Sequence, residues 1–271
     1  MTTICATCAV EYDEGDLPAV CPICADERQW VPAAGQLWTE LATLAGAGQR
    51  LIWSEAEPDR IEITAEPKIG IGQTAQLVHT PAGQLLWDPP GFIDEETVTR
   101  IRALGPVLAV AASHPHMFGV QTEWGEALEA PVLVCAPDVQ WLGRSSARVQ
   151  LWDGDHELAP GLSLHRVGGH FPGAAVALWA AGAGGRGVLL SGDTVFPNPD
   201  RSSVGFMRSY PNKIPMSAAV VERIAARLVP LTFDRVIGNF GNAIDSGAQQ
   251  AVQRSAQRHA AWVRGDYDDL T

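Results

Sequence analysis

The stretch Val107-Leu-Ala-Val-Ala-Ala-Ser-His-Pro-His-Met-Phe-Gly119 combines a predicted strand with a candidate metal site. Its first six residues are apolar, which is typical of a strand buried on both faces of a sheet. The strand runs into two histidines at positions i and i+2, which can point to one ion from a rigid base. Two histidines at this spacing are not sufficient for a metal site, so further ligands are needed.

Two later segments supply them. Gly168-Gly-His-Phe-Pro-Gly173 places a histidine in a turn after the expected strand 162–167, where glycine allows unusual backbone angles and close approach to a ligand. Val188-Leu-Leu-Ser-Gly-Asp-Thr194 places an aspartate after another apolar strand. Three imidazoles and a carboxylate, each following a strand, form a plausible ligand set for one metal. The predicted ligands are His114, His116, His170 and Asp193.

The first 24 residues carry two C-x-x-C pairs, which predict a second, separate metal site. Two such knuckles supply four soft thiolates in a tetrahedron, the geometry that zinc accepts in closed structural sites. About 30 residues bury too little surface to fold alone, so a metal would supply most of the folding energy. Zinc is favoured, and an iron site or a redox-active dithiol are the alternatives. The predicted ligands are Cys5, Cys8, Cys21 and Cys24.

The order H-x-H, then G-G-H-x-x-G, then G-D-T resembles the metallo-β-lactamase superfamily over about residues 50–265. With the cysteine pairs and the segments 124–127 and 206–212, the whole chain resembles a subfamily that carries an N-terminal zinc ribbon. The resemblance implies an α/β (α+β) fold, a four-layer αββα sandwich preceded by the ribbon. It also implies that His114, His116 and His170 are the first-site histidines. Asp193 matches the aspartate that bridges two metals in dinuclear members.

The chain departs from the family pattern at three positions. In the motif H-x-H-x-D-H, Phe118 stands at the aspartate position and Gly119 at the second-site histidine position. Near the last expected core strand, Asn239 stands where the family has a histidine. We therefore expect a reduced site with one metal, in which Asp193 is the motif carboxylate that can take a proton from water. Candidate second-site or substrate contacts are Asn239, Arg208 and Tyr210.

The cysteine pairs predict a zinc ribbon over 1–32, and apolar residues at helical spacing predict a linking helix within 33–49. The resemblance implies a metallo-β-lactamase-like domain over 50–271. Strands first, then β/α alternation, then strands again predict two sheets between outer helices. Predicted strands include 60–64, 76–80, 84–88, 107–112, 131–135 and 233–237, and predicted helices include 37–46, 94–104, 217–228 and 246–263. His79, His165 and Cys135 are interpreted as packing residues.

Composition narrows the class of partner. The 31 acidic and 19 basic residues give a formal net charge of −12, and such a surface repels phosphate backbones, so nucleic acid is not expected. No stretch reaches the ~20 apolar residues of a membrane helix, and no leader pattern follows Met1, so we expect a cytoplasmic protein. A small-molecule substrate is expected. Protein docking through the ribbon and a homodimer are left open.

Three functions fit these observations. The favoured one is a metal-dependent hydrolase of a small ester, thioester, lactone or phosphoester, with zinc or iron in the main site and zinc in the ribbon. The second is a mononuclear non-haem iron oxidoreductase acting on sulfur compounds, because histidines and a carboxylate around open positions suit iron and dioxygen. The third is a non-catalytic metal-binding or interaction protein, because the second-site ligands are missing.

Overall fold

The computed structural model describes residues 2–15 and 17–271, so residues 1 and 16 of the predicted ribbon lie outside the described residues. The chain divides into two compact units, Met1–Asp153 and Gly154–Thr271. Each unit has its own sheet, helices and apolar core. The finer division into ribbon, linker and main domain stays a prediction.

The first unit begins with a small antiparallel sheet in the order β2-β1-β3. Trp38–Glu40 joins this sheet because Trp38 pairs with Cys5 and its ring packs edge-on against Tyr12 at 5.0 Å. The helix predicted over 37–46 is therefore shorter and begins at Leu41. The elements are β1 (Thr3–Cys5), β2 (Glu11–Tyr12), α1 (Pro22–Ala25), β3 (Trp38–Glu40) and α2 (Leu41–Gly46).

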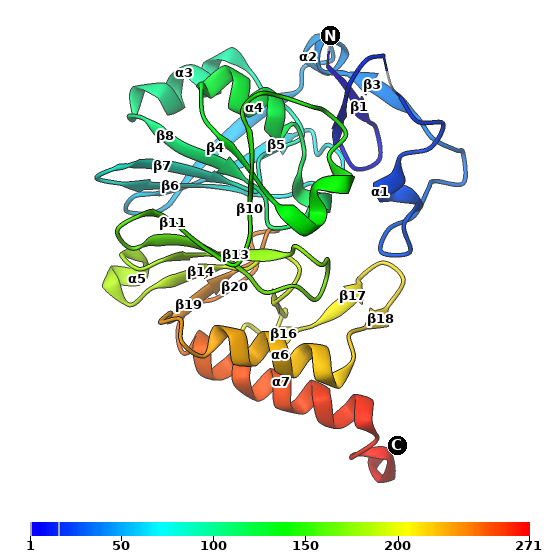
Figure 1. Cartoon of the computed structure of the whole chain (residues 1–271), viewed down its shortest axis with the longest axis vertical. Helices are drawn as coiled ribbons and strands as arrows, with labels where there is room; N and C mark the ends of the chain where they lie inside the picture. Colours follow the sequence, from blue (N-terminus) through cyan, green and yellow to red (C-terminus); the bar gives the residue numbers. More distant parts are fainter. Residues whose placement is uncertain (1, 16) are drawn as a thin grey trace. The chain divides into compact units, whose positions relative to one another are not determined.

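A seven-stranded sheet in the order β10-β9-β8-β7-β6-β5-β4 forms the rest of this unit (Figure 1). The strands β4 to β7 are antiparallel, whereas β7 to β10 are parallel. The apolar run that begins at Val107 becomes β8, with a neighbour on each side, as its composition predicts. The bounds are β4 (Arg50–Glu57), β5 (Arg60–Glu66), β6 (Ala75–Thr80), β7 (Gly83–Trp87), β8 (Val107–Ala111), β9 (Val132–Cys135) and β10 (Val149–Trp152).

Two helices pack together in the first unit, and α4 contacts β8 and β9 (Figure 1). The Asp94 carboxylate accepts a hydrogen bond from the Thr97 backbone N–H at 2.7 Å and starts α3 where the sequence predicts. Leu77, Leu86 and Val110 belong to the core of this unit. The bounds are α3 (Glu95–Ala103), α4 (Gln121–Leu128) and the 3₁₀ turns η1 (Pro115–Met117) and η2 (Ala136–Trp141).

The second unit contains a six-stranded sheet in the order β11-β12-β13-β14-β19-β20, in which only the β14–β19 pair is parallel. The bounds are β11 (Asp155–Ala159), β12 (Leu162–Arg166), β13 (Ala175–Trp179), β14 (Val188–Leu190), β19 (Arg235–Ile237) and β20 (Ala243–Ile244). Two short antiparallel pairs are β15 (Phe196–Pro197) with β16 (Val204–Gly205), and β17 (Met207–Ser209) with β18 (Ile214–Pro215).

The long helices α6 and α7 of the second unit lie side by side (Figure 1). Val221, Ile224, Ala225 and Leu228 follow the helical repeat and form the buried face of α6, with Val252 of α7 in the same core. The bounds are α5 (Gly182–Gly185), α6 (Ala218–Leu228), α7 (Ala248–Arg264) and η3 (Asp268–Leu270).

The two units together confirm the predicted mixed α/β class. Most strands and helices lie within a few residues of the predicted ranges. Within the described part of the chain, no helix combines the length and the apolar character needed to cross a membrane.

Candidate metal centres

The loop after β8 places the two histidines of the H-x-H motif close together. His114 and His116 are 2% and 1% exposed, and their ring centroids lie 5.1 Å apart. The loop is held at its start because the Ser113 backbone N–H donates to the Asp88 carboxylate at 2.6 Å. The Ser113 hydroxyl lies 2.9 Å from Nδ1 of His114 and orients that ring. The first unit thus presents two buried imidazoles from one fixed turn.

Packing accounts for the residues at the next two motif positions. Gly119 has a φ of +51°, and a Cβ there would lie 2.7 Å from the Pro89 carbonyl oxygen and 3.0 Å from that of Pro90. A histidine at 119 would therefore meet backbone atoms. Phe118 is 3% exposed and belongs to an apolar core that it shares with the ribbon cysteines. Phe118 and Gly119 are therefore explained by packing of the apolar core and of the backbone.

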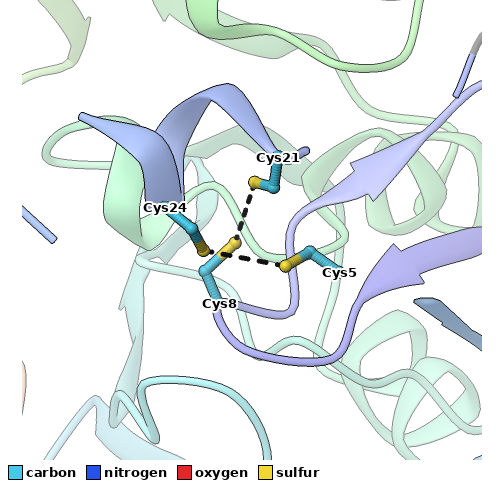
Figure 2. A group of neighbouring side chains, drawn as sticks. All are labelled: Cys5, Cys8, Cys21 and Cys24. Atoms are coloured by element: carbon cyan, nitrogen blue, oxygen red, sulfur yellow. Dashed lines mark hydrogen bonds between the residues drawn. The ribbon is translucent and has the colours of Figure 1, made fainter. Parts of the chain in front are cut away.

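The four N-terminal cysteines form a compact cluster (Figure 2), and all of them are at most 1% exposed. Their sulfur atoms lie within 4.8 Å of one another. Two Sγ–Sγ distances, Cys5–Cys24 and Cys8–Cys21, are 3.7 Å. A tetrahedral ion with Zn–S bonds near 2.3 Å separates its sulfurs by about 3.8 Å. The cluster therefore matches the predicted four-thiolate site, and its sulfurs are much too far apart for disulfides.

Charge within the cluster also points to a cation. Hydrogen bonding with Cys24 lowers the pKa of the Cys21 thiol to about 7, and hydrogen bonding with Cys21 lowers the pKa of Cys5 as well. The contacts with Cys21 raise the pKa of Cys8 and of Cys24. Four buried thiols this close cannot all ionise beside one another unless a positive ion compensates the charge.

The ribbon is joined to the H-x-H loop through Glu11 of β2. Its backbone N–H donates to the Gly119 carbonyl oxygen at 3.0 Å. Its carboxylate accepts from the backbone N–H groups of Thr122 and Glu123, the latter at 3.2 Å. These groups lie in the first turn of α4, where an anion is favoured. Arg144 completes the cluster with an ion pair to Glu11 at 3.0 Å. The ribbon therefore caps the helix that follows the two histidines.

In the second unit, the glycine turn presents His170 in a defined protonation state. The ring is 1% exposed, and Nδ1 lies 2.9 Å from the Met207 backbone carbonyl oxygen. A carbonyl oxygen can only accept, so Nδ1 carries a proton, and in the neutral ring Nε2 holds the lone pair. Gly169 has a φ of +93°, a backbone region that residues with a side chain rarely adopt, and a Cβ there would also displace the end of the Ile224 side chain, which lies 2.6 Å away. The turn therefore requires glycine.

Asp193 follows β14 and lies beside His170. The distance from His170 Nε2 to Asp193 Oδ2 is 3.7 Å, close to the roughly 3.4 Å between two ligands of a tetrahedral ion with bonds near 2.1 Å. The Thr194 hydroxyl donates to the Gly168 carbonyl oxygen at 3.2 Å and ties the two loops together. Tyr210 donates to the Asp193 carbonyl oxygen at 3.1 Å. Burial, and then the nearby Asp193 charge, raise the pKa of the Tyr210 hydroxyl well above its usual range.

Asn239 follows β19, the parallel neighbour of β14, and so leaves the sheet at the same edge as Asp193. It is 2% exposed, and neither atom of its amide has a hydrogen-bond partner within the described residues. Burying an amide without partners costs about 1–3 kcal/mol, so a polar ligand for it is chemically reasonable. Arg208 is half-buried in β17, next to the carbonyl that orients His170.

Within its first unit the structure therefore contains a buried group of four cysteines that could hold a metal ion. Each unit also presents one buried pair of candidate metal ligands, His114 with His116 in the first unit and His170 with Asp193 in the second. Sequence analysis overlooked the Glu11 contacts, which leave no motif. It also assigned His165 to packing, whereas this histidine lies in a hydrogen-bonded series with Ser163 and Asp155. The S-x-H spacing on a strand was the available signal. Cys135 is buried in β9, as expected.

Comparisons with known proteins give one sequence relative and many similar structures. No family model matches the chain. The uncharacterized protein YmaE of Bacillus subtilis (strain 168) is 41% identical over 259 residues, which cover 94% of each chain. The crystal structure of DIM-1 metallo-β-lactamase is similar over 77% of this chain and 98% of its own, with a TM-score of 0.56 and 14% identity.

A metal-soaked Flv1 flavodiiron core from Synechocystis sp. PCC6803 is also similar, with a TM-score of 0.53 and 12% identity over 79% of this chain and 61% of its own. At such identities the similarity concerns the fold alone. It confirms the metallo-β-lactamase fold that the three sequence motifs predict.

Proposed function

Because the chain belongs to the same protein family as YmaE of Bacillus subtilis and has the metallo-β-lactamase fold, we propose that it is a metal-dependent hydrolase. Its substrate would be a small ester, thioester, lactone or phosphoester. The His114–His116 pair and the His170–Asp193 pair would together hold one metal ion, zinc or iron.

The state of His170 is the observation that supports this proposal most directly. Nδ1 of His170 lies 2.9 Å from the Met207 carbonyl oxygen and carries a proton, so Nε2 is the nitrogen that would bind a metal ion. Metal-binding histidines usually donate their second nitrogen to such an acceptor, which fixes the ring and its tautomer. An Asp193 carboxylate oxygen lies 3.7 Å from Nε2, a separation at which both atoms could bind one ion.

The residues beside the motif support the proposal of a single metal. Gly119 cannot carry a ligating side chain against the Pro89 and Pro90 carbonyls, and Phe118 belongs to the ribbon core. Asn239 offers at most an amide oxygen, a weak zinc ligand compared with an imidazole. These three positions therefore lack side chains that would bind a second ion strongly.

Each remaining residue has a role that its contacts support. A bound metal would supply Lewis acidity, which activates water and polarises a carbonyl or phosphoryl oxygen. Asp193 would help hold the ion and take the proton that water loses. Asn239, whose buried amide has no other partner among the described residues, would hydrogen-bond the substrate. Tyr210 would keep the Asp193 loop in place through its 3.1 Å hydrogen bond.

The four cysteines would hold a structural zinc ion, since a closed set of thiolates leaves no open position for chemistry. Their role would be to fix the H-x-H loop, because Met117 and Phe118 share one core with the cysteines and Glu11 caps α4. The ribbon would thus contribute to the main site indirectly. Its outer face also remains a candidate surface for a protein partner.

Metal content and hydrolysis, measured on the same variants, test the proposal. We expect two metal ions per wild-type chain, and one each in His170→Ala and in the Cys5→Ser/Cys8→Ser double variant. His79→Ala changes a histidine outside both groups and should retain two. Hydrolysis of thioester, lactone and phosphodiester substrates should fall at least about 100-fold in His170→Ala and remain in His79→Ala.

The alternatives give different results. Iron in the ribbon-deficient variant, together with oxygen consumption on adding a persulfide, would favour the mononuclear iron oxidoreductase. A wild-type chain with metal in the ribbon alone and no turnover of any substrate would favour a non-catalytic interaction protein. Either result would overturn the hydrolase proposal.

A further inference from the structure

A second group of reactive side chains lies on β11 and β12 of the second unit. Asp155 and His165 are paired residues of these antiparallel strands, and Ser163 precedes His165 by two positions on the same face. The Ser163 hydroxyl lies 2.8 Å from His165 Nε2, and His165 Nδ1 lies 2.6 Å from the Asp155 carboxylate. A serine, a histidine and an aspartate are thus joined in one continuous series.

The proton positions in this series follow from its partners. Arg227 also bonds to the Asp155 carboxylate, which favours the ionised form of that group. An ionised carboxylate can only accept, so Nδ1 of His165 carries a proton and donates it to Asp155. In neutral His165, Nε2 then accepts the hydrogen bond from the Ser163 hydroxyl. This is the arrangement in which a histidine acts as general base towards a serine.

The series also has access to ligands. His165 is 8% exposed, and together with Ser163 it lines a pocket of about 380 Å³. Gly161 and Leu162 form a small apolar part of its wall, and Glu157 stands opposite Ser163 across the two strands. Arg227 offsets the charge of Asp155, so the carboxylate of Glu157 is the lining charge that disfavours an anionic ligand. The pocket therefore suits a small neutral or cationic molecule.

We propose that Ser163 is the nucleophile of a second, metal-independent site, which accepts acyl groups from small neutral or cationic activated esters. The Ser163 oxygen bonds to the acyl carbon while its proton passes to His165 Nε2. The ester C–O bond breaks, and the leaving alcohol takes that proton. Water then attacks the acyl-serine with the same histidine as base, which releases the acid and restores Ser163. General-base assistance of this kind contributes about 10²–10⁴-fold.

Covalent labelling of the full, metal-loaded chain tests this site without using the main one. Diisopropyl fluorophosphate would form an oxygen–phosphorus bond at Ser163 and release fluoride, which intact-mass measurement and peptide mapping detect. We expect one adduct, on Ser163, and none in Ser163→Ala. Labelling should slow at least about 100-fold in His165→Gln. Ser54→Ala, an exposed strand serine elsewhere, serves as the matched control and should label like wild type.

Two further variants distinguish the serine site from the proposed metal site and replace His165→Gln if that variant does not fold. His170→Ala should lose metal-dependent hydrolysis while Ser163 labels at the wild-type rate. Asp155→Asn changes a side chain that is 59% exposed, and should slow labelling even if His165→Gln proves unstable. Turnover of p-nitrophenyl acetate in the presence of a chelator should depend on Ser163. An unlabelled Ser163 in wild type, or equal labelling rates in wild type, His165→Gln and Asp155→Asn, would overturn the proposal.

Discussion

The Gly119→Ala variant tests the steric reason that we propose for a single metal position, the close packing of backbone atoms around residue 119. Glycine is required at 119 for two separable reasons, its φ of +51° and the two carbonyl oxygens that a Cβ would meet at 2.7 and 3.0 Å. These carbonyls cannot easily move. Gln73 donates to the Pro89 oxygen at 2.9 Å, and the Trp124 indole donates to the Pro90 oxygen at 3.3 Å.

The positive φ and the close carbonyl oxygens each lower the stability of the Gly119→Ala variant, by different amounts. A left-handed alanine costs about 1 kcal/mol, and overpacking against fixed atoms costs about 1–3 kcal/mol more. Gly119→Ala should therefore lower the free energy of unfolding by about 2–4 kcal/mol. Gly48→Ala is the matched control, because Gly48 has a φ of +85° but no atom within 4 Å of the added Cβ. It should cost only about 1 kcal/mol.

Urea unfolding of the metal-loaded proteins measures both values from the midpoint and its slope. Equal destabilisation of the two variants would refute the steric part of the argument. A direct extension restores the family motif with Phe118→Asp/Gly119→His, and elemental analysis should find no additional metal ion in that protein. Binding of an extra ion there would show that packing does not close the second position.

Three further predictions concern the ribbon and the Asp193 loop. The Cys5→Ser/Cys8→Ser variant should weaken main-site metal binding about 10–100-fold in a chelator competition, because the cysteines share a core with the H-x-H loop. Burial raises the pKa of Glu11 from 4.5 to about 7, so its contribution to stability is complete below pH 4.5 and is lost as pH rises through 7. The free energy of unfolding of the wild type should therefore fall by about 3 kcal/mol between pH 4.5 and pH values above 7, and the Glu11→Gln variant should not show this fall. Urea unfolding at a series of pH values measures both proteins, and the same fall in the variant would contradict the prediction. Tyr210→Phe removes the hydrogen bond to the Asp193 carbonyl oxygen and should lower the free energy of unfolding by about 1 kcal/mol, measured by thermal unfolding. The metal content should not change. Loss of metal would contradict the purely structural role of this hydrogen bond.

The sequence predicts features that depend on local composition. The apolar run before His114 is short and continuous, which favours a buried strand, and it becomes β8, an inner strand between β7 and β9. Asp94 and Ser217 accept hydrogen bonds from Thr97 and Val220 and start the helices that their positions indicate. The two C-x-x-C pairs need only a short loop to bring four thiols together, so their cluster also follows from spacing.

Features that depend on contacts between distant segments could not be predicted in this way. Trp38–Glu40 lies in the segment 37–46, whose apolar residues have helical spacing, yet it pairs as a strand with β1. Glu11 caps a helix that begins more than a hundred residues later. The Met207 carbonyl that fixes the tautomer of His170 is a backbone atom, and its residue type carries no signal for that role.

The ribbon core and a second metal ligand at position 118 exclude each other on physical grounds. Phe118 is 3% exposed in a core that it shares with the cysteines, Met117 and Val134. An aspartate in this core would be a buried carboxylate among apolar groups, which costs several kcal/mol unless an ion or a hydrogen-bond donor compensates it. Conversely, a phenylalanine at 118 without the ribbon would expose a large apolar surface beside the histidines. If the main site holds one metal ion as proposed, its reduced ligand set and the N-terminal cysteine cluster belong together, because apolar packing of Met117 and Phe118 against the cysteines holds the H-x-H loop in place.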